Sequence, residues 1–113
     1  MLSRQFVREN PETVRAALDE KGVDVDLDRL LAVDEEWREL KSRGDDLRHE
    51  RNEVSSRISE LKQAGEEEAA QEAIERSSEL KEELQEVEAR ADELEAELER
   101  RLLELPQIPH DSV

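Results

Sequence analysis

Basic side chains that could grip phosphate groups are concentrated in one part of an otherwise acidic sequence. Residues 41–62 carry six bases against five acids, a net charge of +1, whereas residues 66–105 carry five bases against sixteen acids, a net charge of −11. The guanidinium group of arginine is a planar fork of donors that matches a phosphate. The candidate phosphate contacts are Arg43, Arg48, Arg57, Lys62 and Arg76. The competing interpretation is pairing along one helix, as Arg57 could pair with Glu53 or Glu60.

No set of residues in the sequence has the pattern of a catalytic centre. His49 and His110 are far apart and lack the spacing of metal ligands. The chain has no cysteine, which excludes disulfides and thiolate metal sites. Its three glycines are too dispersed to form a phosphate-binding loop. We therefore expect no catalytic residue, metal site or cofactor in this chain.

The composition is typical of a long helix rather than of a globular core. Charged residues make up 44% of the chain and aromatic residues only 2%, a mixture found in coiled coils when the apolar positions are periodic. No apolar run approaches the roughly 20 residues needed to cross a bilayer. The first residues also lack the apolar core of a signal peptide. We expect a cytoplasmic protein with no membrane partner.

The net charge of −16, from 33 acids against 17 bases, argues against general affinity for DNA or other nucleic acids. An excess of acids can have two origins: a well-solvated surface on an exposed coiled coil, or adaptation to a very salty cytoplasm. We favour the second. In molar salt the Debye length falls to about 3 Å, so short contacts decide binding.

Apolar positions alternate by three and four residues along two stretches, which predicts two coiled-coil helices. The first stretch is Leu30, Val33, Trp37, Leu40, Gly44, Leu47, Arg51, Val54, Ile58 and Leu61. The second is Ala70, Ala73, Ser77, Leu80, Leu84, Val87, Ala91, Leu94 and Leu98, continuing to Leu102 and Leu105. These positions form the seam along which the two helices would pack. We expect Arg51, a charged residue on this seam, to fix the register or to extend its guanidinium group outward.

Gly65 lies almost midway between the two stretches, so the simplest partner for the first helix is the second. A parallel dimer is the general alternative for any heptad repeat. The hairpin register gives the layers Ile58–Ala73, Val54–Ser77, Arg51–Leu80, Leu47–Leu84, Gly44–Val87, Leu40–Ala91, Trp37–Leu94 and Val33–Leu98. It also places Arg43 near Arg90, and Arg57 near Arg76, on one edge.

The first 30 residues contain signals for a short helix before the hairpin. Asn10 is expected to cap a helix that starts at Pro11 and ends at Lys21-Gly22, and Ser3 to Glu9 adds a short turn before it. Asp26 or Asp28 caps the first long helix. The predicted fold is all-α: a long antiparallel two-helix coiled-coil hairpin with a short N-terminal helix packed at its base.

The order of these features resembles a known family. Asn10-Pro11 opens the short helix, Asp34-x-x-Trp-Arg38 begins the first long helix, and Arg51-Asn52-x-x-Ser55 follows on it. The chain then ends in a Leu-Pro-x-x-Pro-His stretch at residues 105–110. Over essentially its whole length the chain closely resembles the N-terminal domain of bacterial-type seryl-tRNA synthetases, the serine–tRNA ligases.

The resemblance implies that the hairpin is a tRNA-binding arm attached to a class II catalytic domain, which uses ATP and Mg²⁺ to activate serine. Such enzymes are homodimers through the catalytic domain, and each arm reads the long variable arm and elbow of serine tRNA at the other subunit. The implied divisions are a base helix and link (1–25), the arm (26–105, with its tip near 64–67) and an exit linker (106–113). The acidity departs from the family pattern and fits a salt-loving source.

Two other functions remain open at this point. A structural or chaperone-like coiled-coil subunit would hold protein partners, but it predicts an apolar tip, whereas residues 63–67 read Gln-Ala-Gly-Glu-Glu. The other is an acidic spacer that binds no ligand.

Overall fold

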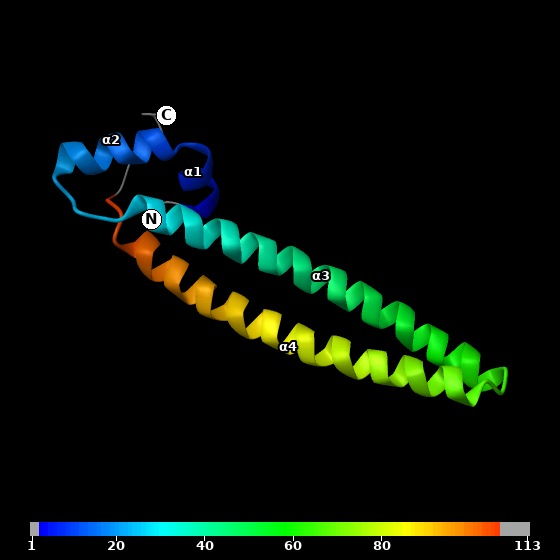
Figure 1. Ribbon diagram of the computed structural model, residues 1–113. Coiled ribbons are helices and arrows are strands. Elements are labelled where there is room, and N and C mark those ends of the chain that lie inside the picture. Colours follow the sequence, from blue (N-terminus) through cyan, green and yellow to red (C-terminus); the bar gives the residue numbers. More distant parts are fainter. Residues whose placement is uncertain (1–2, 107–113) are drawn as a thin grey trace. The chain divides into compact units, whose positions relative to one another are not determined.

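The computed structural model describes residues 3–106, and every regular element in this range is a helix (Figure 1). The helices are α1 (Arg4–Glu9), α2 (Pro11–Lys21), α3 (Leu27–Gln63) and α4 (Glu67–Leu103). A short turn joins α3 to the antiparallel α4, which confirms the predicted all-α helical hairpin. Apart from Pro106, the expected exit linker lies outside the described residues. Within residues 3–106 no helix has an apolar stretch long enough to cross a bilayer.

The chain divides into two compact units. The terminal unit comprises residues 1–38 and 92–113, and the central unit comprises residues 39–91. The terminal unit thus holds α1, α2, the start of α3 and the end of α4. The central unit holds the rest of α3 and α4 with the turn between them.

The N-terminal helices differ from the prediction in two respects. Residues 4–9 form a helix rather than a turn, and the Ser3 side chain accepts a hydrogen bond from the Phe6 N–H at 3.0 Å. Asn10 occupies the N-cap position of α2, as predicted, but its side chain makes no capping hydrogen bond to that helix. Its amide instead donates to the Phe6 carbonyl at 3.2 Å and so closes α1. Because Pro11 has no N–H, the first turn of α2 has one donor fewer to satisfy.

The predicted end of α2 and start of α3 are confirmed. Gly22 has φ +67 and its N–H donates to the carbonyl groups of Leu18 and Asp19, as expected of a glycine that terminates a helix. Of the two candidate caps for α3, Asp26 is the one used: its Oδ1 accepts a hydrogen bond from the Arg29 N–H at 3.0 Å. These caps fix where α2 stops and where α3 starts.

The buried apolar side chains of the terminal unit come from all four helices and the residues that follow α4. They are Val7, Val14, Leu18, Leu27, Leu30, Val33, Leu94, Leu98, Leu102 and Leu105. Trp37 is half-buried, and its layer with Leu94 stays a prediction. The short helices therefore take part in a common apolar core that the hairpin sequence alone would lack.

In the central unit, every residue predicted on the seam is buried or half-buried. Leu47, Leu80 and Leu84 form a buried cluster, and Val54 and Val87 pack against it. A methyl group at Gly44 would lie 3.9 Å from both Leu84 and Val87. The predicted layers Leu47–Leu84 and Gly44–Val87 are confirmed by these contacts, and the remaining layers stay predictions. This seam directs the residues beside it, including the basic candidates, to the edges of the helix pair.

Candidate functional site

All five predicted phosphate contacts are exposed and lie in the central unit. Four come from α3 and one, Arg76, from α4. They fall into three groups according to their carboxylate partners: two arginines paired on one edge, one arginine paired on the other edge, and two residues without an ion pair.

Arg43 and Arg76 lie on the same edge and pair with glutamates of the opposite helix. Arg43 donates to Glu83, and Arg76 donates to Glu50 at 2.8 Å and to Glu79 at 3.4 Å. The hydrogen bond to Glu83 holds the pKa of Arg43 above its ordinary value, and the bond to Glu50 does the same for the pKa of Arg76. Both side chains are charged, but part of each donor fork is in use.

Arg43 and Arg76 thus have carboxylates of the opposite helix as ion-pair partners. The expected placement of Arg43 near Arg90 and of Arg57 near Arg76 stays a prediction. Arginine and glutamate side chains are long, so their heads can meet across neighbouring heptads where opposite charges attract. The register of the apolar seam does not by itself determine which edge residues touch.

Arg48 lies on the opposite edge of the helix pair and has two carboxylate partners. Its Nη1 donates to Asp45 at 3.0 Å, one turn away on α3. Its Nη2 donates to Glu88 on α4 at 2.6 Å. Arg48 therefore links the two helices as well as presenting charge.

Arg57 and Lys62 are the two candidates that have no carboxylate partner among residues 3–106. Arg57 borders a shallow depression with Glu53 and Glu60, its expected partners, but the Glu53 carboxylate instead lies 3.0 Å from His49 Nε2. Both cations can therefore receive an anion without first breaking an ion pair.

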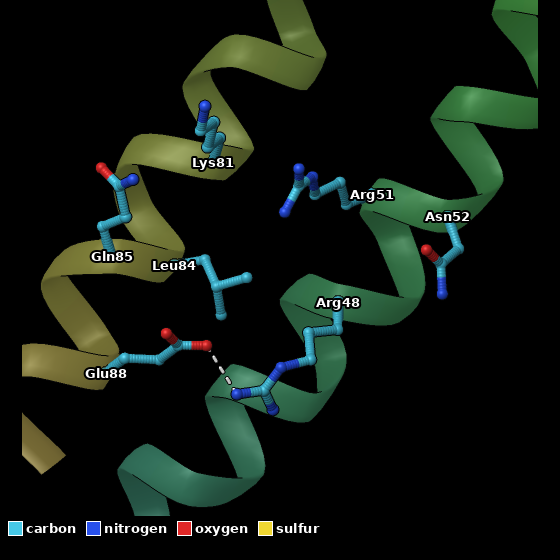
Figure 2. Close-up of a pocket in the computed structure, with 7 residues that line it drawn as sticks. All are labelled: Arg48, Arg51, Asn52, Lys81, Leu84, Gln85 and Glu88. Carbon is cyan, nitrogen blue, oxygen red and sulfur yellow. Dashed lines mark hydrogen bonds and ion pairs between the residues drawn. The ribbon is translucent and has the colours of Figure 1, made fainter. Parts of the chain in front are cut away.

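The sequence did not identify Arg51 and Lys81 as candidates, although both line a groove with Arg48 (Figure 2). The heptad position of Arg51 predicts that it fixes the register or extends its head outward, and does not by itself predict a ligand role. Lys81 directly follows the seam residue Leu80, so the predicted register already placed it on an edge beside the Arg51–Leu80 layer. The predicted proximity of Lys81 to Arg51 could therefore have identified this pair of cations from the sequence.

The chemistry that these residues support is the binding of anions. Among residues 3–106, no three histidine, cysteine, aspartate or glutamate side chains are grouped so that they could hold a metal ion. Guanidinium and ammonium groups on a solvent-facing surface suit phosphate oxygens. Such contacts position a nucleic acid without reading its bases.

Comparison with known proteins assigns the whole chain to one family. The family described as the seryl-tRNA synthetase N-terminal domain matches residues 1–109. The chain is 87% identical over its full 113 residues to the serine–tRNA ligase of Halorubrum lacusprofundi, of which it covers 25%. It is 77% identical over 112 residues to the enzyme of Halobacterium salinarum, covering 24% of it, and 46% identical over 114 residues to that of Kosmotoga olearia, covering 27%.

The chain thus spans about a quarter of the length of these relatives. Two of the three come from halophilic archaea, which fits the acidity of the sequence. The match extends over both compact units, so neither unit stands outside the shared domain. The chain belongs to the seryl-tRNA synthetase N-terminal domain family.

Proposed function

We propose that this chain is the tRNA-binding arm of a serine–tRNA ligase, and that the central unit contacts the long variable arm and elbow of serine tRNA. The observation that carries the proposal is the concentration of basic side chains on α3 in the central unit, where residues 41–62 have a net charge of +1 in a chain of −16. In a domain of this family, such a surface suits an RNA backbone.

The proposed contacts are Arg43, Arg48, Arg57, Lys62 and Arg76. Their exposed cations would bind phosphate oxygens, which fixes the position of the RNA but carries no sequence information. Double-helical RNA hides its base edges in a deep, narrow groove, so proteins recognise it mainly by shape. Selection of serine tRNA would accordingly depend on the presence and direction of its variable arm.

Serine activation belongs, in this proposal, to the part of the ligase that the sequence does not include. A class II catalytic domain would attach serine to the tRNA by using ATP and Mg²⁺, and it would form the homodimer. The whole enzyme would act in the cytoplasm. The arm would contribute binding and orientation, with no group that takes part in the reaction.

A protein-holding coiled coil finds less support in the structure. Val23 and Leu103 are the exposed large apolar side chains among residues 3–106, and both lie in the terminal unit. The turn at residues 64–66 is exposed and carries no large apolar group. A surface for unfolded or apolar clients would need such groups.

The test is binding of serine tRNA to the full-length ligase in molar potassium chloride, with and without the variable arm of the RNA. We expect much weaker binding when the variable arm is deleted. We also expect that a ligase whose residues 39–91 are replaced by a short loop no longer distinguishes the two RNAs. Equal affinity of the intact ligase for both RNAs would refute the proposal.

A further inference from the structure

One groove of the central unit has a charge opposite to that of the molecule as a whole. It encloses about 370 Å³ between α3 and α4. Its lining residues are Arg48, Arg51, Asn52, Lys81, Leu84, Gln85 and Glu88. Three of them are cations and one is a carboxylate, although acids outnumber bases by 33 to 17 in the chain.

Arg51 occupies a position where a coiled coil normally places an apolar residue. Its neighbours on the seam, Leu80 and Leu84, are 0% and 6% exposed, whereas Arg51 is half-buried. Figure 2 shows its guanidinium group extending from α3 toward α4. The aliphatic part of the side chain can cover the seam while the charged head reaches the groove, as long cationic side chains commonly do.

The single carboxylate of the groove is already engaged. Glu88 accepts the hydrogen bond from Arg48 at 2.6 Å (Figure 2). Arg51 and Lys81 form no ion pair with any residue of the described chain. Both cations line the same groove without an ion-pair partner, so an anion bound there would compensate their charge.

We propose that this groove binds backbone phosphates of RNA, with Arg51 and Lys81 as the ligands. The inference rests on the proposed function and adds a contact site to it. Arg51 supplies the planar fork that fits two phosphate oxygens, and Lys81 supplies a compact charge. Asn52 and Gln85 are neutral amides on the groove lining and bring no repulsive charge. Arg48, paired with Glu88, is the third cation of the groove lining.

The experiment compares Arg51→Gln and Lys81→Gln in the full-length ligase. The dissociation constant for serine tRNA is measured over a series of potassium chloride concentrations. Each variant should bind about three- to tenfold more weakly. Each should also reduce the slope of log affinity against log salt by roughly one, the signature of one lost phosphate contact. Glu88→Gln, which raises the positive charge of the groove, should strengthen binding.

The matched control is Arg100→Gln, which removes the same charge from the terminal unit and should leave the affinity and its salt dependence unchanged. Helicity by circular dichroism checks folding. Lys81 is exposed, so its variant reports on the groove even if Arg51→Gln perturbs the seam.

Lys81→Gln with the affinity and salt slope of Arg100→Gln would overturn the inference. The proposed function would survive that result if the intact ligase still required the variable arm. Competition by millimolar inorganic phosphate at constant ionic strength, lost in Lys81→Gln, would support the inference, because phosphate and RNA would then share this groove.

Discussion

Arg8 and Asp34 form a two-pronged ion pair although 26 residues separate them in sequence. Arg8 Nε donates to Asp34 Oδ2 at 2.8 Å, and Nη2 donates to Oδ1 at 3.2 Å. Asp34 also accepts a hydrogen bond from Arg38 at 3.1 Å, and its side chain is only 3% exposed. The hydrogen bond to Asp34 raises the pKa of Arg8. One buried carboxylate thereby fastens α1 to the start of α3.

Replacement of Asp34 by alanine should destabilise the protein markedly. The variant leaves two guanidinium groups without their shared partner, and we expect a loss of about 1–3 kcal/mol in the free energy of unfolding. The partial exposure of Arg8 and Arg38 places the effect below that of a fully buried pair. Urea unfolding measures it. The control is Asp28→Ala, which breaks an exposed pair with Arg15 and should change stability little; equal losses would contradict the prediction.

Alanine should have opposite effects at two glycines of the central unit. Gly44 is helical, and an added methyl group would make ordinary contacts with Leu84 and Val87 at 3.9 Å. Gly44→Ala should therefore raise the free energy of unfolding by about 0.5–1 kcal/mol. Gly65 has φ +76 and no atom within 4 Å of the added carbon, so Gly65→Ala should lower it by about 1 kcal/mol through backbone strain alone. Thermal unfolding of both variants tests this, and a destabilising Gly44→Ala would show that the seam has no room.

Glu97 should give the terminal unit a pH-dependent stability. The hydrogen bond from Arg29, and next the one from Arg101, lower the pKa of Glu97 below its ordinary 4.5. A carboxyl group with a lowered pKa stabilises the fold above its unfolded pKa, and this contribution is lost as the pH falls through the folded value. Glu97→Gln should therefore be less stable than the native protein at pH 7, and the difference should shrink below about pH 4.5. A difference that is constant from pH 7 to pH 3 would exclude this cause.

Salt should stabilise the protein over a wide range of concentration. With a net charge of −16, the folded chain repels itself at low ionic strength, and screening removes that repulsion. Circular dichroism should show higher helicity and a higher melting temperature as potassium chloride increases, until the screening saturates. The same melting temperature in millimolar and molar salt would contradict the interpretation that the acidic surface is an adaptation to salt.

The sequence was sufficient for the parts of the fold that rest on the apolar repeat. The position of Leu47 opposite Leu84 follows from alternating spacings around Gly65, because a buried seam admits one register. The helix α1 and the role of Asn10 did not follow, since a six-residue helix is held by neighbours such as Asp34 that lie far away in sequence. Local patterns carry no information about that contact.

The candidate surface was predictable in its location but less so in its detail. The basic character of residues 41–62 is a property of composition, and the seam fixed which residues reach the edges. The partners of Arg43 and Arg76 depend on how far long side chains reach, which the heptad positions leave open. The seam position of Arg51 left open whether its charged head extends outward, so the groove that it lines with Lys81 could not be identified from the heptad pattern alone.

The ion pairs predict an order of importance among the proposed tRNA contacts. Arg57 and Lys62 have no ion-pair partner in residues 3–106, whereas Arg43 and Arg76 are bonded to Glu83 and Glu50. An RNA phosphate must compete with those carboxylates for the paired arginines. Alanine at Arg57 or Lys62 should therefore weaken binding of serine tRNA by the full-length ligase more, about three- to tenfold each.

Alanine at Arg43 or Arg76 should weaken the binding of serine tRNA by about twofold or less, because the ion pair with a glutamate must be given up before the arginine can bind a phosphate. Removing the competitor should reverse this order: Glu83→Gln frees Arg43, so a following Arg43→Ala should then cost as much as Arg57→Ala. Serine activation measured without tRNA serves as the control for folding and dimerisation, and it should be unchanged in every variant. If the Arg43 substitution has the same effect with Glu83 present and absent, the ion pair does not compete with RNA and the order of contacts must have another origin.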